Sequence, residues 1–232
     1  MRHESRRFTH MGINYVLMPP LQVGKEAGHN FYGSLLSAGI DFTSFAPQQN
    51  RIKIERKPSF PLEILVVGRA SAAKPFGQLL VIAPEPNRPL ENFASEVQAI
   101  LDAFQETWPA QNRQIISCDV SLRCLYPSTS RHAFAEIWEE RLGQSPGPLQ
   151  KLGRQVLGGG LRFVLSPQPG DPEPTRVEVK IESYLQDTKM VFVETQFIWP
   201  EPRPPGSAFD PVGKLQRADQ YLLNEVQAFM AG

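Results

Sequence analysis

Hydrophobic and polar residues alternate along several short stretches of this chain, and such alternation is typical of half-buried β-strands. In residues 51–56, Ile52 and Ile54 point to one side, and the charged residues around them point to the other. With apolar runs bounded by turn residues included, the pattern predicts strands at residues 13–18, 51–56, 62–67, 77–83, 115–126, 161–165, 177–182 and 190–199.

Apolar residues that recur three and four positions apart predict helices elsewhere. The clearest case is residues 90–108, where an apolar stripe runs from Leu90 to Phe104 and Pro109 follows the last residue. The same spacing predicts helices at residues 29–38, 131–142 and 212–230, and residues 149–157 are expected to be helical or irregular.

The predicted elements occur in the same order in the two halves of the chain. Each half has a strand that ends in proline, then a helix, three strands and a long closing helix. The third of these strands ends in Pro-Glu-Pro in both halves, at residues 84–86 and 200–202. Both closing helices contain Glu-Val-Gln-Ala, at residues 96–99 and 225–228. This order favours an internal duplication.

We therefore expect an α+β protein made of two diverged β-α-β-β-β-α repeats. Each repeat would have an antiparallel sheet with helices packed on one face, and a pseudo-two-fold axis would relate the two. The first repeat would cover residues 13–110, the second residues 111–232, and residues 1–12 would form a polar N-terminal extension. Met11 is an alternative start to Met1, and the sequence leaves this choice open.

Three of these features resemble those of a known protein family: the charged strand at residues 51–55, the strand pair at 177–184 and 190–199, and the closing helix that ends at Met230. The chain is similar in these features to a sporadically distributed bacterial family of about this length, to which no activity is assigned. The resemblance extends over most of the chain. It implies a bacterial origin, and it transfers no functional residue.

The charge balance argues against two classes of binding partner, nucleic acids and anionic membranes. Lys plus Arg and Asp plus Glu both number 24, so the formal net charge is zero and no global field attracts nucleic acid or an anionic membrane. No apolar run approaches the ~20 residues that span a bilayer. The first ten residues also lack the apolar core of a secretion signal, so we expect a cytoplasmic protein with no membrane partner.

The two cysteines fit a reducing compartment. Cys118 and Cys124 lie in one predicted strand with an even spacing, so both side chains point to the same face. At ~3.3 Å per residue they are too far apart for a disulfide, and two buried free thiols are expected.

The densest basic stretch contains Arg51, Lys53, Arg56 and Lys57. Four cations in one strand and turn are a candidate contact for a nucleic-acid backbone. Glu55 interrupts the stretch, and a solvated outer face of the sheet is the alternative interpretation.

A second candidate lies on the predicted helix at residues 131–142. His132, Glu136 and Glu139 share one helix face and could perform acid-base chemistry or begin a metal site. The sequence indicates no further ligand, so no metal and no cofactor are expected, and a solvated helix face is the alternative. The glycines at residues 158–160 lack phosphate-loop spacing and predict a flexible turn.

The leading hypothesis is a non-enzymatic binding or adaptor protein that engages a protein partner. One alternative is an enzyme or small-ligand binder with its site at the junction of the two halves, to which His132 and Glu136 would contribute. The other is a nucleic-acid binder that uses residues 51–57. The sequence leaves a homo-oligomer open.

Overall fold

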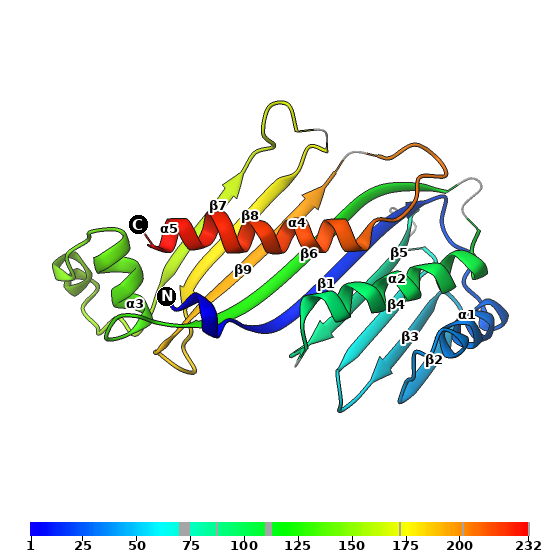
Figure 1. The fold of residues 1–232 in the computed structure, drawn as a ribbon, viewed down its shortest axis with the longest axis horizontal. Coiled ribbons are helices and arrows are strands. Elements are labelled where there is room, and N and C mark those ends of the chain that lie inside the picture. Colours follow the sequence, from blue (N-terminus) through cyan, green and yellow to red (C-terminus); the bar gives the residue numbers. More distant parts are fainter. Residues whose placement is uncertain (70–74, 87, 110–112, 172, 201, 232) are drawn as a thin grey trace.

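The computed structural model describes residues 1–232 except 70–74, 87, 110–112, 172, 201 and 232. Its strands form one antiparallel sheet of nine strands in the order β2-β3-β4-β5-β1-β6-β9-β8-β7 (Figure 1). Helices cover one face of this sheet, which confirms the predicted α+β class.

The elements follow one another in two groups along the chain. The first group is β1 (Arg7–Met18), α1 (Lys25–Ser37), β2 (Ser44–Gln48), β3 (Arg51–Arg56), β4 (Leu62–Val67), β5 (Gly77–Pro84) and α2 (Leu90–Thr107). The second group begins with β6 (Gln114–Pro127) and α3 (Ala133–Ala135), which continues as a π-helical segment (Glu136–Arg141). A 3-10 segment (Gly147–Leu152) and the strands β7 (Gly160–Leu165), β8 (Arg176–Ser183) and β9 (Met190–Trp199) follow. The group ends with α4 (Pro211–Tyr221), which continues as a π-helical turn (Leu222–Val226) and α5 (Gln227–Ala231).

The two groups meet at the pairing of β1 with β6 in the middle of the sheet. Met11 lies opposite Leu122, and Tyr15 lies opposite Cys118. The two sheets expected from the sequence are therefore one continuous sheet. This arrangement satisfies the backbone groups of two strands that would otherwise be exposed sheet edges.

The core lies between the sheet and its helices. Alternate residues of the central strands, such as Ile13 and Val120, are fully buried on this side. The closing helices α2 and α4 lie over the sheet and contact each other (Figure 1). Helix α1 packs beside α2, where Phe31 contacts the ring of Phe104 edge to face. The opposite face of the sheet carries the polar residues of the alternating pattern.

One strand is longer than the sequence predicted. The first strand was expected to begin at Ile13, and β1 begins at Arg7, within the segment expected to be a polar extension. The correction follows from the position of β1 in the centre of the sheet. Its polar residues face the side without helices, and His10 there bonds Ser121 across the strand pair at 3.0 Å.

Two other elements also differ from the prediction. Strand β2 was not predicted, because Pro47 and the polar end residues Ser44 and Gln48 weaken the alternating pattern. The helix expected at residues 131–142 is only partly α-helical, because α3 gives way to π-helical turns after Ala135.

The cysteines lie as predicted. Cys118 and Cys124 are both buried free thiols, and burial raises the pKa of each to about 12. No helix within the described part of the chain is both long and apolar enough to cross a membrane.

Candidate functional site: the edge strand β7 and its groove

The second half of the sheet is less completely covered than the first. In the first half, α1 lies beside α2 and contacts β2. The corresponding helical residues of the second half instead pack at the turn between β8 and β9, where the Ala133 amide donates to the Thr188 carbonyl at 2.8 Å. The side of β7 and β8 that faces α4 therefore carries a groove.

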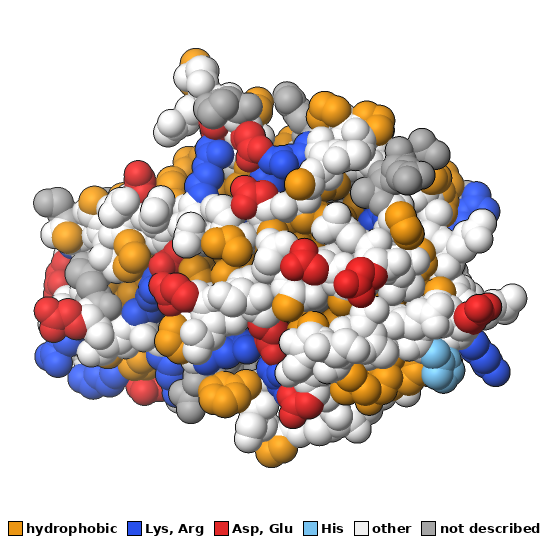
Figure 2. All heavy atoms as spheres, turned by 45° about the vertical axis from the view of Figure 1, so that its right-hand side comes forward, with side chains coloured by type: hydrophobic (Ala, Val, Ile, Leu, Met, Phe, Trp, Pro, Cys, Tyr) orange, Lys and Arg blue, Asp and Glu red, His pale blue; other side chains and the backbone are white. Residues whose placement is uncertain are grey.

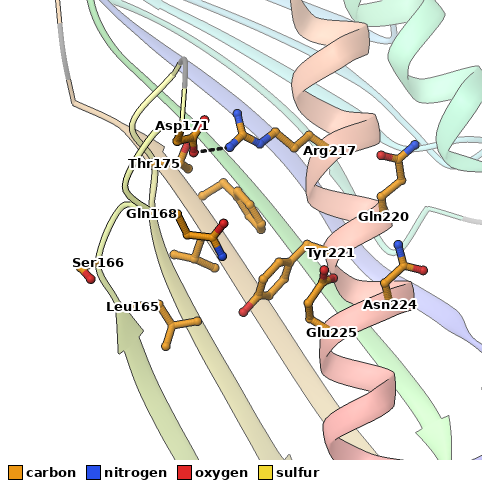
Figure 3. Close-up of a pocket in the computed structure, with 12 residues that line it drawn as sticks. Leu165, Ser166, Gln168, Asp171, Thr175, Arg217, Gln220, Tyr221, Asn224 and Glu225 are labelled. Atoms are coloured by element: carbon orange, nitrogen blue, oxygen red, sulfur yellow. Dashed lines mark hydrogen bonds and ion pairs between the residues drawn. The ribbon is translucent and has the colours of Figure 1, made fainter.

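Strand residues form the floor of this groove, and the closing helix forms its wall. The groove is apolar toward α5, where a cavity of about 220 Å³ is lined by Phe163, Leu165, Val179, Ile181, Tyr221, Glu225, Val226 and Phe229. Toward α4 it becomes polar, with a cavity of about 290 Å³. Leu165, Tyr221 and Glu225 line both cavities, so the two form one continuous groove. In Figure 3, Tyr221 and Leu165 project into the space between helix and strands.

The connection between β7 and β8 closes the polar end of the groove. Asp171 accepts a hydrogen bond from Arg217 of α4 at 2.5 Å (Figure 3). Glu173 accepts one from Lys214 at 3.0 Å and also pairs with Arg203. Lys214 lies 4.0 Å above the ring of Trp199, and burial lowers its pKa to about 8. These ion pairs hold the connection against α4.

Strand β7 is the last strand of the sheet on this side, and its side chains are unusually exposed for apolar residues. Phe163 is 36% and Leu165 38% exposed on the groove side, and Val164 is 61% exposed on the opposite side. An edge strand with apolar side chains on both faces is a template for pairing with another chain.

The backbone of β7 presents its free groups at alternate residues. The Ser183 amide donates to the Gly159 carbonyl at 3.0 Å, and hydrogen-bonded pairs alternate with unbonded pairs in an antiparallel ladder. In this register Phe163 bonds to Val179 of β8. The N–H and C=O groups of Arg162 and Val164 therefore point away from the sheet.

The structure separates the two candidates on the second-half helix. His132 caps α3, where its Nδ1 accepts from the Ala135 amide at 3.0 Å. Glu136 is buried and accepts from the Ser128 hydroxyl at 2.6 Å, from the Thr129 amide at 2.8 Å and from the Met1 amino group. These donors hold the pKa of Glu136 below its usual value although burial opposes them. The two side chains do not converge on one cavity, and a binding role for them stays a prediction.

The structure also divides the four basic candidates. Arg56 lies on the helix side, where it donates to Glu96 of α2 at 2.6 and 3.1 Å. Lys53 and Lys57 pair with Glu55 at 2.9 and 3.5 Å, and Arg51 is exposed. On the face drawn in Figure 2, basic and acidic side chains are interspersed. The four side chains do not form one positive surface, and nucleic-acid binding through them stays a prediction.

The glycines at residues 158–160 allow close packing. A Cβ atom on Gly160 would lie 2.2 Å from the Ile181 carbonyl, and one on Gly158 would lie 2.4 Å from the Ser183 hydroxyl. Within the described part of the chain, no group of three or more His, Cys, Asp or Glu residues is arranged to hold a metal ion.

Sequence reasoning missed the groove. Its one local signal is the run from Leu161 to Leu165, in which apolar residues occupy both faces of a strand. Comparisons with known proteins add no assignment, because no family model, curated protein or solved structure matches the chain. The resemblance to a sporadically distributed bacterial family therefore stays a prediction.

Proposed function

We propose that this chain is a non-enzymatic binding protein that receives a strand of a partner protein along the edge of β7. The added strand would extend the sheet, and its alternate side chains would fill the groove beside α4 and α5. The observation that carries the proposal is the combination of free backbone groups at Arg162 and Val164 with exposed apolar side chains on both faces of β7.

The opposite edge of the sheet provides a contrast within the same molecule. Strand β2 contains Pro47, which removes a backbone donor and opposes pairing with another strand. Its Phe45 stacks on Tyr32 of α1, with ring centroids 4.7 Å apart. Strand β7 has neither a proline nor a covering helix among the described residues. The two edges thus differ in the features that prevent or permit strand addition.

A strand accounts for the exposed surface better than a helix would. A helix laid in the groove would cover Phe163 and Leu165, but it would leave Val164 and the outward backbone groups uncovered. A strand paired to β7 would satisfy those backbone groups and place side chains on both faces. With a contact of about six residues, we expect a weak, transient complex, with Kd of about micromolar order.

The charge of the groove suggests the composition of the partner. Glu225 lines both cavities, and it has no ion pair with any described residue. Its sequence counterpart in the first half is Glu96, which pairs with Arg56 and Arg88, both at 2.6 Å. A partner strand with alternating apolar residues and one Arg or Lys near Glu225 would complete the equivalent arrangement.

The proposal includes the internal duplication. It is supported by the strand order, in which β5-β1 and β9-β6 flank one central pairing, and by the contact between the closing helices α2 and α4. Among the described residues of the second half, no strand corresponds to β2. In this account, the second copy lacks the added strand and covering helix of the first, and a partner supplies the missing layer. A cytoplasmic location stays part of the proposal.

Peptide display provides the test. Twelve-residue peptides selected on the parent protein should have alternating apolar residues with a basic residue. Their binding, measured by fluorescence anisotropy, should weaken at least about tenfold in Val164→Pro, since proline removes an outward donor while the ladder to β8 remains. Leu223→Ser removes an exposed apolar side chain that does not line the groove, and this variant should bind the peptides as the parent protein does.

Two outcomes would overturn the proposal. One is equal peptide affinity of Val164→Pro and the parent protein. The other is self-association of the parent protein that Val164→Pro abolishes in sedimentation, because the occupant of the edge would then be a second copy of this chain.

A further inference from the structure

A second cavity lies on the opposite side of the sheet, where the two halves of the chain meet. Its volume is about 610 Å³, and its lining comes from β1, the turn after β5, β6, β9 and the turn before β9. The residues are Arg7, Phe8, Thr9, Glu85, Pro86, Arg123, Leu125, Tyr184 and Phe192. Arg123 and Phe192 alternate with Cys124 and Val193, which are buried on the helix side. The cavity is therefore separated from the β7 groove by the sheet.

The backbone departs from regular geometry at this cavity in two places. The register of β1 against β6 shifts between Phe8 and His10, so Thr9 forms a β-bulge. Glu85 has a φ of 48°, which is rare for a residue with a side chain, and its amide donates to the Thr9 carbonyl at 2.9 Å. Bulges and left-handed residues are enriched at binding sites because they redirect side chains.

The cavity combines apolar surface with an excess of positive charge. Leu125, Tyr184 and Phe192 provide aromatic and aliphatic contacts, whereas the Phe8 side chain packs against the core on the helix side, opposite Cys124. Arg123 is held in place by Glu194, whose carboxylate accepts from its Nε at 2.7 Å. Arg7 is exposed and forms no ion pair with any described residue. Two guanidinium groups and one carboxylate, Glu85, line the cavity.

We propose that this cavity binds a small organic anion with a flat aromatic body. The anionic group would accept hydrogen bonds from the guanidinium of Arg7, with Arg123 beside it, because guanidinium groups donate in parallel to carboxylate, sulfonate or phosphate oxygens. The aromatic body would lie against Phe192 and Tyr184. Small-molecule sites combine apolar surface with a few oriented polar groups, and this lining, although mainly polar, provides both. The proposal is independent of strand addition at β7.

The affinities of two matched fluorescent probes test the proposed anion site. 8-Anilinonaphthalene-1-sulfonate carries the aromatic body and the anion, and N-phenyl-1-naphthylamine carries the same body without the anion. The sulfonate should bind the parent protein saturably at one site. Arg7→Gln should weaken the sulfonate about tenfold and leave the neutral probe within about twofold, since it removes only a charge-assisted hydrogen bond.

Two further variants locate the site. Phe192→Ala should weaken both probes, whereas Phe229→Ala, in the β7 groove, should weaken neither. Three results would overturn the proposal: absence of saturable binding of the sulfonate to the parent protein, unchanged affinity in Arg7→Gln, or loss of both probes in Phe229→Ala. None of these results bears on peptide binding at β7.

Discussion

The ring of Phe163 on β7 meets the ring of Phe229 on α5 edge to face, with centroids 5.5 Å apart. Both rings remain more than one third exposed, at 36% and 40%. The pair joins the end of the closing helix to the edge strand and forms the apolar end of the groove. It therefore links the stability of α5 to the surface at which we propose that a partner binds.

Removing one ring of this pair should have a small effect on stability and a larger one on binding. Phe229→Ala should lower the free energy of unfolding by about 1 kcal/mol, because the ring is only partly buried. It should also weaken peptide binding, since the groove loses one wall. Urea unfolding of Phe163→Ala, Phe229→Ala and the double variant measures the coupling of the two rings. Additive losses would contradict a direct ring contact.

Stability should depend on pH through His10. Burial, and then the nearby Arg123, lower the pKa of His10 from 6.5 to about 4, while Glu194 acts in the opposite direction. Between these two pH values the unfolded chain binds a proton that the native chain does not. The free energy of unfolding should therefore fall as the pH falls from about 6.5 toward 4, by at most about 3 kcal/mol.

Urea unfolding at a series of pH values measures this dependence. His10→Gln should remove most of the slope between pH 4 and 6.5. His29→Gln, which changes an exposed histidine on α1, should keep it. An unaltered slope in His10→Gln would refute the assignment.

The carboxylate of Glu96 should be important for the stability of the first half. It pairs with Arg56 and Arg88, and the three side chains are 13%, 12% and 7% exposed. Glu96→Gln should lower the free energy of unfolding by about 2–3 kcal/mol, because the poorly solvated guanidinium of Arg88 loses its counter-charge and that of Arg56 keeps only the exposed Asp41, at 3.5 Å. Glu106→Gln, on the exposed side of the same helix, should change it by less than about 0.5 kcal/mol. Equal effects of both variants would contradict this role.

The two thiols should be unreactive in the native protein. Burial raises the pKa of Cys118 and Cys124 to about 12, and thiolate is the reactive form. A colorimetric disulfide reagent at pH 8 should therefore react with neither thiol in buffer and with both in denaturant. Rapid reaction in buffer would show that β6 opens readily.

Local patterns predicted most of the strands and both long helices. Ile52 and Ile54 are buried as their alternation indicates, because the period of a strand is a local property. The beginning of β1 was missed, since His10 and its polar neighbours resemble a tail until the partner strand β6 is known. Glu136 was assigned to a solvated or catalytic face, and its burial depends on donors such as Ser128 that the helical pattern does not include.

The candidate site depends on long-range order, which the sequence pattern does not contain. The residues of β7 predict a strand, but its position at the edge follows from the pairing of β6 with β9 and of β8 with β7. The groove likewise requires that residues 133–141 pack at the turn between β8 and β9 and leave the strands open. The separation of the four basic candidates follows from the contact of Arg56 with α2.

Amide hydrogen exchange across β7, measured by NMR with and without a selected peptide, tests the central claim most directly. In the free protein, the amides of Arg162 and Val164 should exchange rapidly, whereas that of Phe163 should be protected by β8. Peptide binding should protect Arg162 and Val164, the alternate pattern that an added strand produces. Saturating peptide that left these two amides as unprotected as before would contradict strand addition at this edge.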